Sequence, residues 1–150
     1  MNRGVSGKQK YESQLIATAS PEICVVMLYE RLVDDLECAD AVFDKPDFKP
    51  AFDSLIHAQQ IIRLLRSSMD TGIWQGGANL ISLYNWFEAR LSRSAMFQDR
   101  GALREVIPLI GELAKAWKQA ADRVGSARES DGPREYAFAE TRSQIADYFA

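Results

Sequence analysis

The sequence contains one histidine and two cysteines among its 150 residues, and this scarcity excludes most metal chemistry. Di-iron helical bundles use a Glu and a His three residues apart on each of two helices, whereas His57 stands alone and follows Ser54 at that spacing. Structural zinc sites draw four ligands from paired Cys and His residues, and the chain has no such pairs. We therefore expect no metal and no other cofactor.

The two cysteines cannot form a disulfide with each other. Cys24 and Cys38 lie on one predicted helix, where a rise of about 1.5 Å per residue separates them by roughly 21 Å. That separation is several times the reach of a disulfide. Because free cysteines are commonly buried, we expect both to be apolar packing residues.

The chain also lacks a long apolar run and a strong excess of charge of either sign. Its longest apolar run has seven residues, whereas a membrane-spanning helix needs about 20. The first ten residues contain Arg and Lys but no apolar segment of the kind found in a signal peptide. A net charge of −3 gives no electrostatic reason to expect nucleic-acid binding. We expect a cytoplasmic protein with no nucleic-acid partner and no membrane insertion.

The parts of an enzyme are missing as well. His57 could act as a base only with an orienting acid and an oxyanion site, and Asp53 is the only carboxylate within helical reach on its own face. The double glycine at 76–77 is not followed by Lys and Ser or Thr, so it is not a phosphate-binding loop. We expect no catalytic residues and no enzymatic activity.

What the sequence does contain is a strong helix signal beginning at Ser20. Ser20 can cap the helix, Pro21 suits its first position, and Glu22 faces the positive end of the helix dipole. After an apolar run at residues 23–29, helical spacing continues through Val25, Leu28, Leu32, Leu36, Ala39 and Phe43. Since the first two turns are apolar on every side, they need cover from several directions. The cover could come from the preceding segment, a second copy or a partner.

Three further helices are predicted. The second starts at Asp47 or Lys49 and reaches Met69, the third carries an apolar stripe from Leu80 to Leu91, and the fourth runs through residues 103–124. Pro108 lies one turn into the fourth helix, where we expect a frayed, kinked or later start. Four helices with short connections predict an all-α, antiparallel up-down four-helix bundle over residues 11–124.

The two ends of the chain differ from the bundle. Residues 1–10 are polar and predicted to be disordered, and residues 11–19 are expected to form a turn or small helix against the bundle. Residues 125–133 read as a linker. The last stretch, from Arg134 to Ala150, is too apolar for a free tail. We expect it to form a short docking helix, although the sequence does not indicate where it docks.

Three features exceed what a four-helix core needs. They are the all-round apolar start of the first helix, the semi-apolar segment 11–19, and a second apolar band on the second helix formed by Phe52, Ile61 and Leu64. Large apolar surfaces often bind partners, and an amphipathic helix in a groove is one common arrangement. The alternative is that these features complete an irregular core, and the pattern alone favours neither interpretation.

Several sequence strings resemble, in order and spacing, those of the flagellar secretion chaperone FliS family. The strings are T-A-S-P-E at 18–22, M-L-Y-E at 27–30, A-Q-Q-I-I at 58–62, S-S-M-D at 67–70, G-G-A-N-L-I-S-L-Y at 76–84 and L-A-K-A-W at 113–117. The resemblance implies a cytoplasmic export chaperone that binds the C-terminal region of flagellin, prevents its premature polymerisation and assists its delivery to the export apparatus. It also names export-gate components as further candidate partners.

The resemblance further implies which residues meet the client. In this family the N-terminal segment lies over the groove, and groove and cover together correspond to Tyr11, Leu15, Ile16, Thr18, Tyr29, Leu32, Leu36, Leu80, Leu83 and Tyr84. Leu32, Leu36 and Leu83 could equally be ordinary core residues. We expect a monomer, and the alternative function is a homodimeric helical-bundle adaptor without a flagellin client.

The sequence departs from the family pattern at three places. Arg31 stands where many relatives have a small residue, and Leu15 stands where Gln is common. Residues 125–150 extend past the usual end of the family and could form a further partner site or a second covering element.

Overall fold

The computed structural model describes residues 7–69, 77–127 and 132–149, and the regular secondary structure of these residues is entirely α-helical. The helices are α1 (Gly7–Thr18), α2 (Pro21–Val42), α3 (Lys49–Met69), α4 (Gly77–Phe97), α5 (Arg100–Ala127) and α6 (Gly132–Phe149). In the described part of the chain, no helix is both long and apolar enough to cross a membrane. The prediction of an all-α bundle is confirmed.

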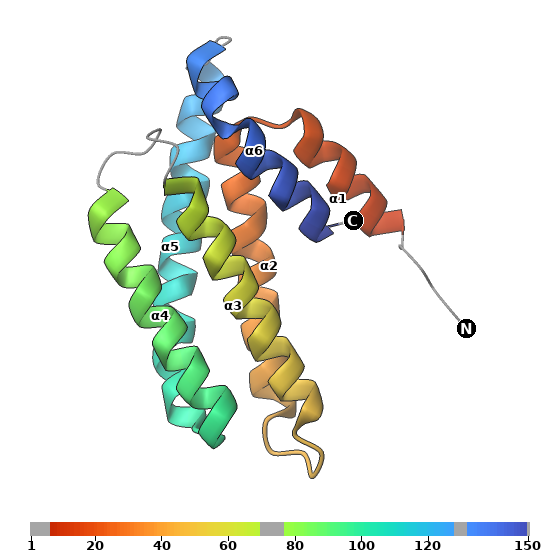
Figure 1. The fold of residues 1–150 in the computed structure, drawn as a ribbon, viewed down its shortest axis with the longest axis vertical. Helices are drawn as coiled ribbons and strands as arrows, with labels where there is room; N and C mark the ends of the chain where they lie inside the picture. The colour runs from red at the N-terminus through yellow and green to blue at the C-terminus, as the bar shows by residue number, and fades with distance from the viewer. Residues whose placement is uncertain (1–6, 70–76, 128–131, 150) are drawn as a thin grey trace.

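The four long helices form a ring in which each packs against its neighbours. α2 contacts α3 and α5, and α4 completes the ring between α3 and α5. Figure 1 shows that successive helices of this ring run in opposite directions. The ring follows from the short connections, because a short loop returns the chain beside the helix it has just left.

The start of α2 forms as its sequence predicts. The Ile23 N–H donates to the Ser20 side chain at 3.2 Å, and Pro21 occupies the first turn.

The exposure of Cys38 differs from the expectation, because of the two cysteines only Cys24 is buried. Cys38 lies off the stripe of Leu36 and Ala39 that faces the core, so the helical period turns its thiol outward.

The connection between α4 and α5 is short. Gln98 adopts a left-handed conformation with φ of 52°, and the Asp99 N–H donates to the Ser94 carbonyl oxygen at 3.3 Å. This pattern ends a helix while satisfying its last carbonyl groups. The Asp99 carboxylate then accepts from the Ala102 N–H and so caps α5.

Pro108 does not delay the start of α5, which begins eight residues earlier at Arg100 and continues through the proline. An internal proline costs about 3 kcal/mol in a helix, so the first turns need other support. They receive it from buried Leu103 and Val106 and from Arg100, which donates to Asp40 of α2 at 2.9 Å. Of the frayed, kinked or later start that we expected, the later start is therefore wrong.

The remaining helices, α1 and α6, pack against each other outside the ring. The main partner of α1 is α6, while α6 also contacts α2 and α3. Figure 1 shows α6 lying between α1 and the α2/α3 side of the ring. The expected break at 69–77 falls largely on residues 70–76, which lie outside the described residues. Of the predicted disorder at 1–10, residues 1–6 also lie outside them, whereas residues 7–10 form the start of α1, so the prediction is wrong there.

An ion-pair cluster joins α3 to α4. Glu88 accepts from Arg63 and Arg66 at 2.7 Å each, and its own side chain is largely buried. Burial alone would raise the pKa of Glu88, but the hydrogen bonds from Arg66 and Arg63 outweigh it and leave this pKa below its ordinary value. A carboxyl group with a lowered folded-state pKa stabilises the fold above its unfolded-state pKa, and this stabilisation is lost as the pH falls through the folded value.

We predict that Glu88→Gln lowers the unfolding free energy by about 1–2 kcal/mol at neutral pH, because both guanidinium groups lose a charged acceptor. The difference from the parent should shrink as the pH falls below about 4.3 and the parent carboxylate protonates. Urea unfolding at about pH 7 and about pH 3 measures this. Glu112→Gln, at an exposed carboxylate, is the matched control and should change little. An equal loss at both pH values would contradict the prediction.

Candidate functional site

The ten residues that the sequence singles out for client contact fall into different environments. Tyr29 and Tyr84 are fully buried, and their hydroxyl oxygens lie 2.7 Å apart. The Tyr29 ring stacks on Trp117 with ring centroids 6.3 Å apart, and the two side chains also share a hydrogen bond. This aromatic cluster joins α2, α4 and α5 inside the ring.

Burial determines the chemistry of the aromatic cluster. It raises the pKa of Tyr84 to about 12. It raises the pKa of Tyr29 further, and the neighbouring Tyr84 adds to this effect. Both hydroxyl groups therefore remain neutral and act as hydrogen-bonding groups in an apolar interior, where an unpaired hydroxyl would be costly.

The predicted leucines divide between the core and its margin. Leu32 and Leu36 are buried in the same core as the aromatic cluster. Leu80 and Leu83 on α4 are half-buried and pack against that core. Leu32 and Leu36 are thus closed to solvent, whereas Leu80 and Leu83 each keep part of their surface exposed.

The N-terminal residues of the predicted set lie on α1. Ile16 is buried and belongs to the main core cluster, and Leu15 is half-buried. Tyr11 is 64% exposed. Thr18 is exposed, and its hydroxyl donates to the Leu15 carbonyl oxygen at 3.4 Å. One helix thus presents a buried residue toward the bundle and an exposed aromatic ring toward solvent.

The face of α2 and α3 that lies outside the ring is covered by α6. Three apolar residues of α6 are buried, namely Phe138, Ile145 and Phe149. Their spacing of seven and four places them on one side of a helix. Burying each contributes about 1.5–3 kcal/mol. The sequence shows this stripe but does not identify the surface beneath it.

A polar cluster fixes the last turn of α6 to this face. The Nδ1 atom of His57 on α3 lies 2.8 Å from the Asp35 carboxylate on α2 and 2.6 Å from the Tyr148 hydroxyl on α6. Burial raises the pKa of Asp35, and His57, Arg31 and Tyr148 offset only part of that effect. Burial, together with the charge of Asp35, also raises the pKa of Tyr148. Three helices therefore meet at one hydrogen-bonded cluster.

Sequence reasoning missed this arrangement, since it considered only Asp53 as a carboxylate partner for His57. Asp53 instead pairs with Lys49 at 2.8 Å. Asp35 and His57 are 22 positions apart, and no local spacing links them. In the described ranges, no group of three or more His, Cys, Asp and Glu side chains is arranged to hold a metal ion.

The middle of α6 holds the C-terminus of α1. The Arg142 guanidinium donates to the Ile16 carbonyl oxygen at 2.9 Å and also to that of Ala19. These carbonyl groups lie at the negative end of the α1 dipole, where a cation is stabilising. Arg142 also lies over the Phe138 ring, 5.5 Å from its centroid.

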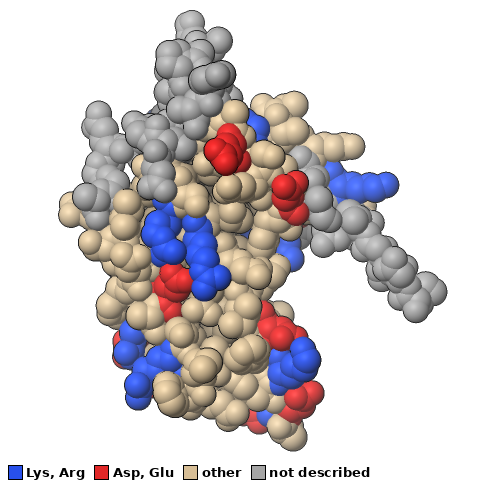
Figure 2. Space-filling model, in the orientation of Figure 1, with Lys and Arg blue, Asp and Glu red and all other residues tan. Residues whose placement is uncertain are grey.

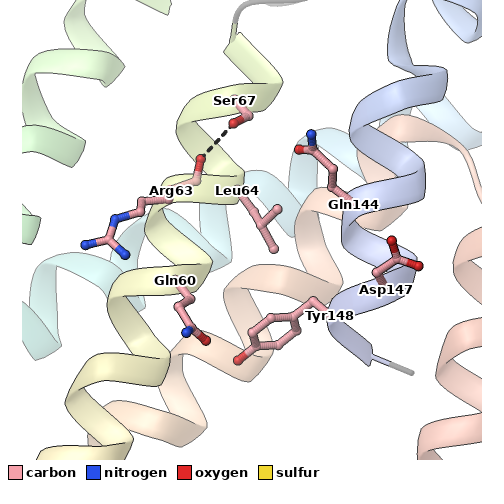
Figure 3. A pocket seen from close by; sticks show the side chains of 7 residues that line it. All are labelled: Gln60, Arg63, Leu64, Ser67, Gln144, Asp147 and Tyr148. Carbon is pink, nitrogen blue, oxygen red and sulfur yellow. Dashed lines mark hydrogen bonds between the residues drawn. The ribbon is translucent and has the colours of Figure 1, made fainter.

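A groove of about 500 Å³ remains along the flank of α6, facing α3. Figure 3 shows Leu64 on α3 and Gln144 and Tyr148 on α6 around this opening. The complete lining is Gln60, Arg63, Leu64, Ser67, Gln144, Asp147 and Tyr148. The contact between α6 and α3 is therefore incomplete on this side.

We predict that Tyr29→Phe lowers the unfolding free energy by about 1–2 kcal/mol, because the Tyr84 hydroxyl then loses a buried partner. The double variant Tyr29→Phe with Tyr84→Phe should lose less than the sum of the single losses, since the two hydroxyl groups depend on each other. Thermal or urea unfolding of all four proteins gives the coupling energy. Strictly additive losses would show that the hydroxyl pair contributes nothing as a pair.

Comparison with known proteins identifies the family. The family model described as "Flagellar protein FliS" matches residues 5–124. The chain is also similar to the flagellar secretion chaperone FliS of Bacillus subtilis (strain 168), with 27% identity over 122 residues, covering 81% of this chain and 91% of that protein. The family match extends from α1 into α5, and α6 lies beyond it. The chain therefore belongs to the FliS family of flagellar proteins.

Proposed function

We propose that this protein is a flagellar export chaperone that binds the C-terminal region of flagellin. In this role it prevents premature polymerisation of flagellin and assists its delivery to the flagellar type III export apparatus. The observation that carries the proposal is the family match over residues 5–124, which spans α1 to α4 and most of α5. The relative in Bacillus subtilis is itself named a flagellar secretion chaperone.

The packing of α2 supports this function physically. Most residues in its first two turns are buried, and part of their cover comes from α6 rather than from the ring. Displacement of the outer helix α6 would therefore expose apolar surface on α2. An amphipathic segment that cannot bury its own apolar stripe could use that surface, which is what an unassembled client would require.

The ten predicted residues have two roles in this proposal. Leu15 and Ile16 belong to the cover, with Tyr11 and Thr18 on its outer side. Tyr29, Leu32, Leu36, Leu80, Leu83 and Tyr84 form the wall or the layer beneath it. Because Tyr29 and its core neighbours have no exposed surface, they would support the wall from beneath.

The remaining parts of the proposal follow from the same role. We assign the protein to the cytoplasm, where unassembled flagellin is made, and expect no catalysis. Components of the export gate are further candidate partners. We expect a monomer, because a homodimeric adaptor would bury its spare apolar surface against a second copy instead of a client.

We predict one-to-one binding of the C-terminal segment of flagellin from the same bacterium, with micromolar or tighter affinity and a negative heat-capacity change. Titration calorimetry at three temperatures measures all three quantities. Light scattering on the same sample gives the oligomeric state. A dimer that produces no heat with this segment would overturn the proposal in favour of the adaptor.

We also predict that this affinity changes little between low and moderate salt, because apolar burial rather than ion pairing provides the binding energy. On the face shown in Figure 2, positive and negative side chains lie in mixed groups with a wide uncharged area between them. Repeating the titration at two salt concentrations tests this expectation. A steep loss of affinity with salt would assign the binding to charged contacts.

A further inference from the structure

The surface that α6 covers has the properties of a helix-binding site. α6 contacts α2 and α3 of the ring, and Phe138, Ile145 and Phe149 enter the main core cluster. Arg142 reaches Cys24 near the start of α2. About two turns further along both helices, Phe149 packs beneath Arg31. α6 therefore runs along the first half of α2, in the same direction as α2.

The contacts that hold α6 combine an apolar stripe with two polar attachments, one near the middle of the helix and one in its last turn. Arg142 binds the carbonyl groups at the end of α1, and Tyr148 binds His57 and Asp35. Between these attachments the flank of α6 leaves the groove beside Leu64 open. An apolar stripe accompanied by polar contacts is the pattern by which an amphipathic helix docks in a groove.

The position of α6 in the chain distinguishes it from the helices of the ring. The family match ends at residue 124, eight positions before α6 begins at Gly132. The face of α2 and α3 beneath α6 thus belongs to the shared family fold, whereas its cover belongs to the added segment. α1, which the match includes, has α6 as its main partner.

We propose that α6 is an intramolecular occupant of the client-binding face, and that an amphipathic helix of the client displaces it from α2 and α3. This inference rests on the proposed function and adds a regulatory step to it. When α6 is docked, the face is closed, and the apparent affinity for the client is reduced by the fraction of molecules in which α6 is released. Displacement of α6 also releases α1, because α6 is the main contact of α1.

The test compares full-length variants that weaken the docking of α6 without altering the face beneath it. Ile145→Glu puts a charge into the buried stripe, and Tyr148→Phe removes the hydroxyl that binds His57. Ser143→Glu adds the same charge at an exposed position of α6 and is the matched control. Circular dichroism and thermal unfolding check that each variant keeps the ring folded.

Each protein is titrated with the C-terminal segment of flagellin from the same bacterium. We expect Ile145→Glu to bind about tenfold more tightly than the parent, Tyr148→Phe to show a smaller gain, and Ser143→Glu to match the parent. Hydrogen exchange provides the second measurement. Amides of residues 138–149 should exchange faster in the parent saturated with the segment, while those of α2 and α3 should exchange more slowly.

The other outcomes separate the two proposals. Equal affinities with unchanged protection of α6 would overturn the displacement of α6 and leave the chaperone function standing. Weaker binding by Ile145→Glu and Tyr148→Phe would also overturn it, because α6 would then be part of the binding site. No binding by any folded variant would overturn the chaperone function, and this inference with it. Tyr148→Phe keeps the test decisive if Ile145→Glu does not fold.

Discussion

The apolar start of α2 constrains the whole structure, because residues 23–29 leave no side of that helix suited to water. In a four-helix ring each helix has two neighbours, and for α2 these are α3 and α5. Its remaining side needs a further element, which α6 provides. The extra helix is thus a direct consequence of how much apolar surface α2 carries.

The starts of α2 and α3 were predictable because their signals are local. Ser20 and Pro21 define the start of α2, and Lys49 begins α3 within the range that the sequence allows. The docking position of α6 was not predictable, since it depends on a hydrogen bond between His57 and Tyr148, which are 91 positions apart. Local periodicity indicates that one face of a helix is apolar, but it does not indicate which element covers that face.

The candidate site illustrates the same limit for individual residues. Tyr29, Tyr84 and Trp117 each lie in one of the strings that resemble the family, and the fold brings all three together inside the ring. The sequence pattern is the same for a buried tyrosine whose hydroxyl has a hydrogen-bond partner and for a tyrosine that lines a groove. Arg31, at which the resemblance to the family predicts a departure, lies over the Phe149 ring of the added helix. Two unusual features of the sequence therefore meet in space.

The contact between α1 and α6 also determines the order in which the fold can be completed. Arg142 and Ile16, which it joins, are 126 positions apart, so this contact closes a loop that contains nearly the whole chain. Loop closure of that length is entropically expensive, and contacts of this kind form late in folding. During synthesis α1 is made before α6, so its main partner becomes available only after the ring helices have been made. Until α6 has been made, the helix that covers the α2/α3 face in the finished fold is not available to cover it.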